Sequence, residues 1–384
     1  MKKYPFIMLT VIAAIAFAFN ACNKQSPLKA LTPSLPAQPY DYVSGLQNGV
    51  IAQGGNNSPQ TNPVTNAGAA LGRVLFYDPR LSVTNSVSCG SCHKQQYAFA
   101  DNVPLSTGYA GMKGTRNALA IINASTKASF FWDGRASTLE EQTLMPVVNH
   151  VEMGMEKLDA LALKLNQISY YPQLFQSAFG SSEITPQEIS GALAQFVRSI
   201  VSDNSKFDAN QAAFTADELA GFQLFFGKFQ CGTCHKGENL GGAPLMDSYF
   251  NQAVPASSVK NISNIGLDLK YADGGVGVLL NNVKMDGDFV IPSLRNVALT
   301  APYMHDGRFA TLDEVVDHYS NGILPNPNLD PILLQQNFFS NPSLPAEPVQ
   351  MKMTAQEKRQ LIAFLNTLTD YTMLTDDKYS NPFK

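Results

Sequence analysis

Two short segments of this 384-residue chain combine residue types that can carry out chemistry. Cys89-Gly90-Ser91-Cys92-His93 and Cys231-Gly232-Thr233-Cys234-His235 both follow the pattern C-x-x-C-H. This pattern is the attachment signature of c-type haem, in which two thiols bind the vinyl groups and the adjacent His is held under the iron. A single C-x-x-C could be a redox dithiol or half of a zinc site. Two copies, each followed by His, instead predict two covalent haems.

The remaining cysteine, Cys22, follows an export signal. Residues 1–21 begin with a Met and two lysines and continue with an apolar run, Pro5 to Phe19, that is short for a membrane span. The ending Phe19-Asn20-Ala21-Cys22 resembles a bacterial lipobox. We therefore predict a signal peptide over residues 1–21, lipidation at Cys22 and a periplasmic protein. The alternative is ordinary cleavage with Cys22 incidental. Covalent haem is attached outside the cytoplasm, which also requires export.

The composition is that of a globular protein with a sizeable core. Hydrophobic residues make up 45% of the chain and charged residues 15%, and the formal net charge is −4. This charge disfavours nucleic-acid binding, which needs a basic face. No second apolar run approaches 18 residues, so we expect membrane contact only through the N-terminal lipid anchor.

The segments that must position the motifs are predicted to be helices joined by long loops. Residues 22–62 are rich in Pro, Gln, Asn, Ser and Gly, which predicts a flexible tether. Beyond it, period-2 strand patterns are scarce, while four S/T-x-x-E capping boxes mark helix starts. The boxes are Thr185–Glu188, Thr215–Glu218, Thr311–Glu314 and Thr354–Glu357. We therefore expect a mostly α fold with long loops.

The chain contains a weak internal duplication. Gly72–Tyr77 precedes the first haem motif and Gly221–Phe226 precedes the second. Downstream of the motifs, Asp133–Glu141 matches Asp306–Glu314. A haem motif and an Asp-Gly-Arg string thus recur in the same order, which predicts two related domains.

Each predicted domain is cytochrome c-like and carries one covalent haem. The first extends over residues 63–205 and the second over residues 206–384. The boundary is placed near Asp203–Asp208, because this short stretch is polar.

Three longer strings accompany the motifs. They are Phe130–Arg135, Leu139–Gln142 with Glu152-Met153, and Leu294–Val297 with Thr300–Gly307. Together with both haem motifs, they make the chain resemble the bacterial di-haem cytochrome c peroxidase family, including its MauG-like branch, from roughly Ala67 to Thr369. The resemblance implies that the first haem is the peroxide site and that the second transfers electrons.

The resemblance also implies roles for three residues near the first motif. Glu152 falls at the position of the acid-base carboxylate, which can take a proton from the inner oxygen of peroxide and give one to the outer oxygen. Gln142 falls where the family has a polar residue that orients peroxide. Trp132, the only tryptophan, falls at a position thought to relay electrons between the haems. Without the resemblance, Glu152 would be interpreted as a helix-start or surface acid and Trp132 as a core aromatic.

The chain departs from the family pattern in the loop that faces the first haem. In members that need reductive activation, a His follows Ser-x-Gly and blocks this haem. Here the string is Ser106-Thr107-Gly108-Tyr109, and no His lies between His93 and His150. We therefore expect the first haem to be open in the resting enzyme. Tyr109 is either a phenolate ligand or a packed loop residue.

A second departure concerns the axial ligand of the second haem. Other members have Met fourteen residues after the residue that matches His305, whereas this chain has Tyr319. The MauG-like branch has Tyr at this place, and a hard phenolate ligand favours ferric iron. Tyr319 is thus the leading candidate, with His318 and Met304 as alternatives.

The family also binds a calcium ion between its domains. The resemblance places its ligands at the Asn117 side chain and at the backbone carbonyls of Thr300 and Pro302, and such oxygen donors suit Ca²⁺. Asn117 could otherwise be a simple turn residue. His150 stands where the family usually has Pro, and its role is left open.

Three functions are compatible with the sequence. The leading one is a peroxidase that reduces hydrogen peroxide to water with electrons from a small periplasmic protein, such as a c-type cytochrome or a cupredoxin. The second is a MauG-like oxidase that modifies a partner protein through long-range electron transfer. The third is a non-catalytic di-haem electron carrier, which Glu152, Gln142 and the open first haem disfavour.

Overall fold

A computed structural model describes residues 31–49, 52, 55–209, 211–242, 261–335 and 347–383. The predicted signal peptide and Cys22 lie outside the described residues. Within the described ranges, no helix combines the length and the apolar character that a membrane crossing requires.

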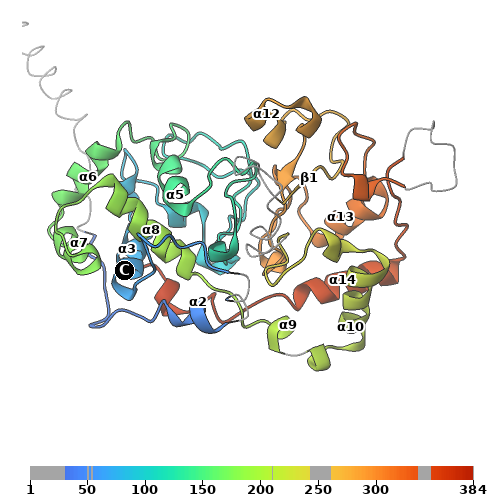
Figure 1. The fold of residues 1–384 in the computed structure, drawn as a ribbon, viewed down its shortest axis with the longest axis horizontal. Helices are drawn as coiled ribbons and strands as arrows, with labels where there is room; N and C mark the ends of the chain where they lie inside the picture. Colours follow the sequence, from blue (N-terminus) through green and yellow to red (C-terminus); the bar gives the residue numbers. More distant parts are fainter. Residues whose placement is uncertain are drawn as a thin grey trace, which may run out of the picture.

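The described chain is mostly helical and forms two domains that lie side by side (Figure 1). The hydrophobic core is divided accordingly into one cluster dominated by residues 42–200 and another formed by residues 225–368. The helices of the first domain are α2 Ser44–Asn48, α3 Asn66–Tyr77, α4 Cys89–Cys92, α5 Leu139–Val148, α6 Leu158–Asn166, α7 Tyr171–Phe179 and α8 Pro186–Ser199. Those of the second are α9 Lys206–Ala209, α10 Ala216–Gln223, α12 Val276–Leu280, α13 Leu312–Asp317 and α14 Ala355–Asn366. The predicted fold class is confirmed.

Local sequence signals start the helices as predicted. Each of the four predicted capping boxes is formed, with the Thr hydroxyl accepting from the backbone N–H three residues later and the Glu side chain accepting from the Thr N–H. They begin α8, α10, α13 and α14. The described strands are short: β1 Ile262–Ser263 pairs antiparallel with β2 Phe289–Val290.

The duplication in the sequence corresponds to a repeated helix crossing. In the first domain α3 packs against α8, and in the second α10 packs against α14. Gly72 lies at the first crossing and Gly221 at the second. A Cβ at Gly72 would lie 2.0 Å from the Ala192 carbonyl oxygen, and one at Gly221 would lie 1.9 Å from that of Gln360. Each pair of helices therefore approaches closely only because a glycine stands there.

Two further details repeat in both domains. In each domain, an aromatic residue follows the glycine of the helix crossing by five positions, and the glycine of the haem motif packs on its ring. Gly90 packs on Tyr77, and Gly232 packs on Phe226. Each Asp-Gly-Arg string forms a tight bend closed by a β-bridge, and each bend leads into a Thr-capped helix. The bridges are Phe130 with Ala136 and Tyr303 with Phe309.

The chain ends depart from the predicted domain limits. Part of the predicted tether is packed, since Tyr42 is buried against Phe196 and its hydroxyl donates to the Lys378 carbonyl. At the other end, the chain beyond Asp370 leaves the second domain and returns beside α3 (Figure 1). There Tyr379 is buried and its hydroxyl donates to the Ser199 carbonyl at 2.8 Å. Tyr42 and α2 are therefore packed rather than part of a free tether, and residues 373–383 pack against the first domain.

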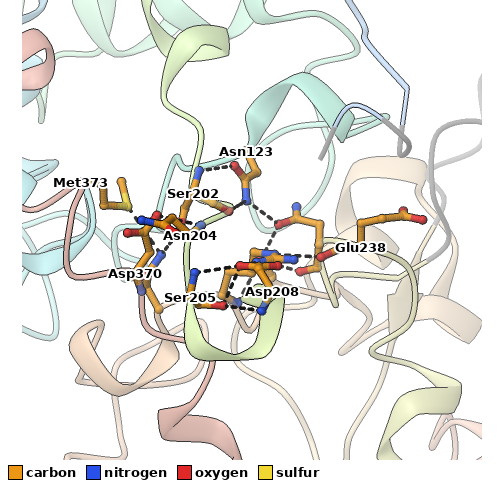
Figure 2. Close-up of polar contacts among 12 residues, drawn as sticks. Asn123, Ser202, Asn204, Ser205, Asp208, Glu238, Asp370 and Met373 are labelled. Carbon is orange, nitrogen blue, oxygen red and sulfur yellow. Dashed lines mark hydrogen bonds and ion pairs between the residues drawn. The ribbon is translucent and has the colours of Figure 1, made fainter. Parts of the chain in front are cut away.

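The predicted boundary is a hydrogen-bonded junction (Figure 2). The Asn123 side-chain amide donates to the Ser202 carbonyl at 3.0 Å, and its Oδ1 accepts from the Ser202 N–H at 2.8 Å. The Ser202 hydroxyl accepts from Asn296 of the second domain. Asp208 forms an ion pair at 2.7 Å with Arg295, which is fully buried. Removing one partner of such a pair leaves an uncompensated charge in the interior, so the junction constrains how the domains meet.

The helix crossing at Gly221 provides a test of the duplicated fold. Gly221→Ala should lower the free energy of unfolding by about 1–3 kcal/mol, because the new methyl group overlaps the Gln360 carbonyl. Gly227→Ala is the matched control, since a Cβ there meets no atom within 4 Å and should change stability by less than about 0.5 kcal/mol. Denaturant titration of the haem-loaded protein measures both. Equal stability of the two variants would contradict the assigned crossing.

Candidate functional site

The first haem motif is built on a single helical turn. Helix α4 spans Cys89–Cys92, and the Ser88 cap begins it. The His93 imidazole lies directly after this turn, and its Nδ1 lies 3.0 Å from the Phe99 carbonyl oxygen. Burial lowers the pKa of His93, which favours the neutral imidazole. A neutral ring held through Nδ1 presents Nε2 to a metal ion.

The second motif repeats this geometry beside a large cavity. Its Cys231–Thr233 segment is a short helical turn, and His235 Nδ1 lies 3.0 Å from the Leu240 carbonyl oxygen. Cys231, Cys234 and His235 line a cavity of about 500 Å³ whose other walls are mainly aliphatic and aromatic. This volume lies within the range of cofactor pockets.

The donor set fits covalent haem. All four motif thiols are free rather than paired in disulfides. Burial raises the pKa of Cys89 and of Cys231 to about 12, so neither behaves as an activated redox thiol. Free thiols, a neutral imidazole and an apolar cavity suit haem attachment, and they do not suit a dithiol redox centre.

Glu152 lies on a turn that faces the first motif. Its Oε1 accepts from Asn149 Nδ2 at 2.9 Å. Burial raises the pKa of Glu152, and the Arg135 charge partly opposes this shift. After larger effects of burial and other groups, the Glu152 charge also raises the pKa of both Cys89 and Cys92, which places the carboxylate near these thiols. A half-buried carboxyl with a raised pKa is suited to both take up and release a proton.

The loop that lacks the blocking His packs directly against the Glu152 turn. Tyr109 N–H donates to the Glu152 carbonyl at 2.9 Å. A Cβ at Gly108 would lie 1.7 Å from the Val151 carbonyl oxygen, so only glycine permits this approach. The Tyr109 ring covers Gly154, which has a φ of +69° that glycine tolerates. This packing matches the alternative in which Tyr109 is a packed loop residue.

Gln142 and His150 both lie close in sequence to Glu152 but differ in exposure. Gln142 lies in α5 and is half-buried, and His150 is exposed at the turn before Glu152. The role of Gln142 in orienting peroxide stays a prediction, and no described contact assigns a role to His150.

Trp132 lies between the two domains. Its Nε1 donates to the Asn117 carbonyl at 2.8 Å, and its own carbonyl accepts from Val290 N–H at 2.8 Å. Its ring is edge-on to Phe289 and His305 of the second domain, and it lines the second cavity. The expected position between the haem sites thus agrees with the geometry, while electron relay stays a prediction.

The three candidate ligands of the second haem differ in position. Tyr319 and Met304 both line the second cavity. Burial raises the pKa of Tyr319, and the nearby Cys231 and Cys234 thiols add to this shift. In contrast, His318 Nε2 lies 2.9 Å from the Ile265 carbonyl oxygen. Its Nδ1 faces the backbone at Gly322. The geometry therefore favours Tyr319 or Met304 over His318.

The three predicted calcium ligands line the same cavity. They are Asn117, Thr300 and Pro302. The Asn117 side-chain amide donates to the Val103 and Pro104 carbonyls, which turns its Oδ1 the other way. Among the described residues, no cluster of three or more His, Cys, Asp and Glu could hold a metal ion, so calcium would depend on amide and carbonyl oxygens. The calcium site stays a prediction.

Two functional candidates were missed by sequence reasoning. Arg116 pairs with Asp133 of the first domain at 2.6 Å and with Asp273 of the second at 2.6 Å. Lys127 lines the second cavity from the first domain. Arg116 precedes the predicted ligand Asn117, which could have drawn attention to it. No sequence signal marks Lys127, because the cavity that it lines is formed mainly by residues distant in the chain.

The chain is similar to known di-haem proteins in sequence and in structure. A family model for di-haem cytochrome c peroxidase matches residues 66–215. The chain is 34% identical to the methylamine utilization protein MauG of Methylorubrum extorquens over 315 residues, covering 81% of this chain and 80% of that protein. It is 36% identical to the cytochrome c551 peroxidase of Nitrosomonas europaea over 256 residues, covering 65% of this chain and 71% of that protein. Among solved structures, a MauG-like protein associated with microbial copper homeostasis matches with a TM-score of 0.71 and 30% identity, over 94% of this chain and 99% of that one.

The axial ligand of the second haem can be tested by substitution. Tyr319→Phe should convert one low-spin haem to high spin, because the phenyl ring cannot bind iron. Tyr303→Phe is the matched control: Tyr303 lines the same cavity, but its hydroxyl donates to the Val297 carbonyl at 3.0 Å. Resting absorption and electron paramagnetic resonance spectra measure both variants. An unchanged Tyr319→Phe spectrum would assign the ligand to Met304 instead.

Proposed function

Because the chain belongs to the di-haem cytochrome c peroxidase family, we propose that it reduces hydrogen peroxide to water at the first haem motif. The observation that carries this proposal is the half-buried Glu152 carboxylate, which faces Cys89 and Cys92 from a turn packed against a loop without His. Electrons enter through the second domain. The reaction consumes two electrons and two protons for each peroxide and yields two waters.

Cys89, Cys92 and His93 would hold the first haem, which would supply the peroxide-binding and electron-transfer chemistry of the site. Glu152 accepts the proton of the inner peroxide oxygen and returns it to the outer oxygen, which then leaves as water. Its raised pKa brings proton uptake and release closer to neutral pH than for an exposed carboxylate. The Asn149 amide orients the carboxylate by donating to Oε1. Gln142 orients the substrate.

The loop Ser106–Tyr109 leaves the first site open in the resting enzyme. It carries no His, and the close contact at Gly108 fixes it against the Glu152 turn. Peroxide therefore reacts without prior reduction of the second haem.

Electrons come from a small periplasmic redox protein, a c-type cytochrome or a cupredoxin. Trp132 connects the sites, because its ring faces His305 and Phe289 in the wall of the second cavity while its backbone belongs to the first domain. A signal peptide over residues 1–21 exports the chain, and lipidation at Cys22 anchors it to a membrane. The Asn117 amide and the Thr300 and Pro302 carbonyls would hold a structural calcium ion.

A second function is favoured by one specific observation. Tyr319 lies in the second cavity where other family members have Met, and two relatives at 34% and 30% identity are MauG proteins. A phenolate ligand would let the second haem hold oxidising equivalents and act on a partner protein. Peroxide-dependent modification of a partner protein, in place of turnover with a reduced cytochrome, would assign this function.

The role of Glu152 can be tested with a matched pair of variants. Glu152→Gln keeps the size of the side chain and loses the base, so peroxide consumption should slow by about 10²–10⁴-fold with the resting spectrum retained. Glu156→Gln, an exposed carboxylate four residues away, should retain the wild-type rate. Stopped-flow mixing with peroxide measures both. A wild-type rate in Glu152→Gln would place the proton shuttle elsewhere, with His150 the first residue to examine.

A further inference from the structure

The second cavity has an unbalanced charge. Among the described residues, its lining contains two lysines, Lys127 and Lys228, and neither Asp nor Glu. Lys228 is largely exposed and forms an ion pair with Glu357. Lys127 comes from the first domain, and none of the described residues pairs with its ammonium group. A cation in such a cavity therefore lacks a protein counter-ion.

The backbone holds Lys127 in this position. Its N–H donates to the Ala124 carbonyl at 3.2 Å, and its carbonyl accepts from Asn57 Nδ2 at 2.9 Å. Asn57 Oδ1 in turn accepts from Arg198, which is fully buried. Asn123, four residues earlier, is fixed to the junction between the domains (Figure 2). The segment cannot swing outward without breaking these contacts.

Electrostatics places the Lys127 charge near both haem sites. Burial lowers the pKa of Lys127 to about 8. The Lys127 charge also contributes, after burial, to the lowered pKa of His93 in the first motif, while the residue itself lines the cavity of the second motif. Lys127 is half-buried at an apolar cavity. An unpaired cation in such a place is costly, and an anion held beside it lowers that cost.

Haem brings the missing anions. Each porphyrin carries two propionate carboxylates on the edge opposite to its vinyl groups, and the vinyl groups are fixed at the cysteines. We propose that Lys127 binds a propionate of the haem attached at Cys231 and Cys234, and that its charge raises the reduction potential of this haem. Lys127 is thus a positioning residue that couples the first domain to the electron-entry haem.

A nearby cation favours the ferrous state, because reduction removes one positive charge from the iron. A unit charge about 10 Å away in a medium of effective dielectric constant about 20 changes an equilibrium by at least about tenfold. Loss of the Lys127 charge should therefore shift the reduction equilibrium of the second haem about tenfold toward the ferric state. For a one-electron couple this corresponds to a fall of about 59 mV.

Spectroelectrochemical titration of the haem-loaded protein tests the proposal. Lys127→Met should lower the potential of the second haem by this amount, whereas Lys127→Arg should retain it. Lys228→Met is the matched control, because it removes the same charge from the lining of the same cavity at an exposed, already paired site, where the effect is screened. Pyridine-haemochrome assay verifies that every variant carries two haems.

An unchanged potential in Lys127→Met, a shift confined to the first haem, or an equal shift in Lys228→Met would each overturn the assignment. The proposal rests on the two haems of the family and not on peroxide turnover. A chain that fails as a peroxidase would still show the predicted potentials, so the two failures are distinguishable.

Discussion

Three short hydrogen bonds around Trp132 connect the two domains that carry the haem motifs. Asn117 N–H donates to the His305 carbonyl at 2.7 Å, Trp132 Nε1 donates to the Asn117 carbonyl at 2.8 Å, and Val290 N–H donates to the Trp132 carbonyl at 2.8 Å. Because these bonds are buried, leaving any donor or acceptor unpaired would cost about 1–3 kcal/mol. The Trp132 ring, the wall of the second cavity and the predicted calcium ligand Asn117 all depend on this contact.

The two haem sites use the same scaffold for different chemistry. Both place C-x-x-C-H on one helical turn, fix the His through Nδ1 to a backbone carbonyl, and pack the motif glycine on an aromatic ring. They differ in what faces the motif: a carboxylate with a raised pKa in the first domain and a cavity lined by Tyr319 in the second. Duplication thus provides the framework, and a few side chains distinguish the site proposed to transfer protons from the site proposed to transfer electrons.

Sequence reasoning succeeded where the signal is local. The haem motifs, the four capping boxes and the repeat around Gly72 and Gly221 each depend on residues within a few positions of one another, and all correspond to features of the structure. It failed for segments whose structure depends on distant partners. Tyr42 and Tyr379 are buried by contacts with residues more than 150 positions away in the chain. Their neighbours in the sequence are polar and loop-like, so the sequence around them did not indicate burial. Lys127 was missed for the same reason.

We propose that the Ser106–Tyr109 loop leaves the first haem open beside Glu152. Stopped-flow mixing of the fully ferric enzyme with one equivalent of peroxide tests this proposal most directly. Immediate loss of the ferric spectrum, without any added reductant, is the result that the open site predicts. An all-ferric enzyme that is inert, and that reacts only after reduction of the second haem by one electron, would contradict it.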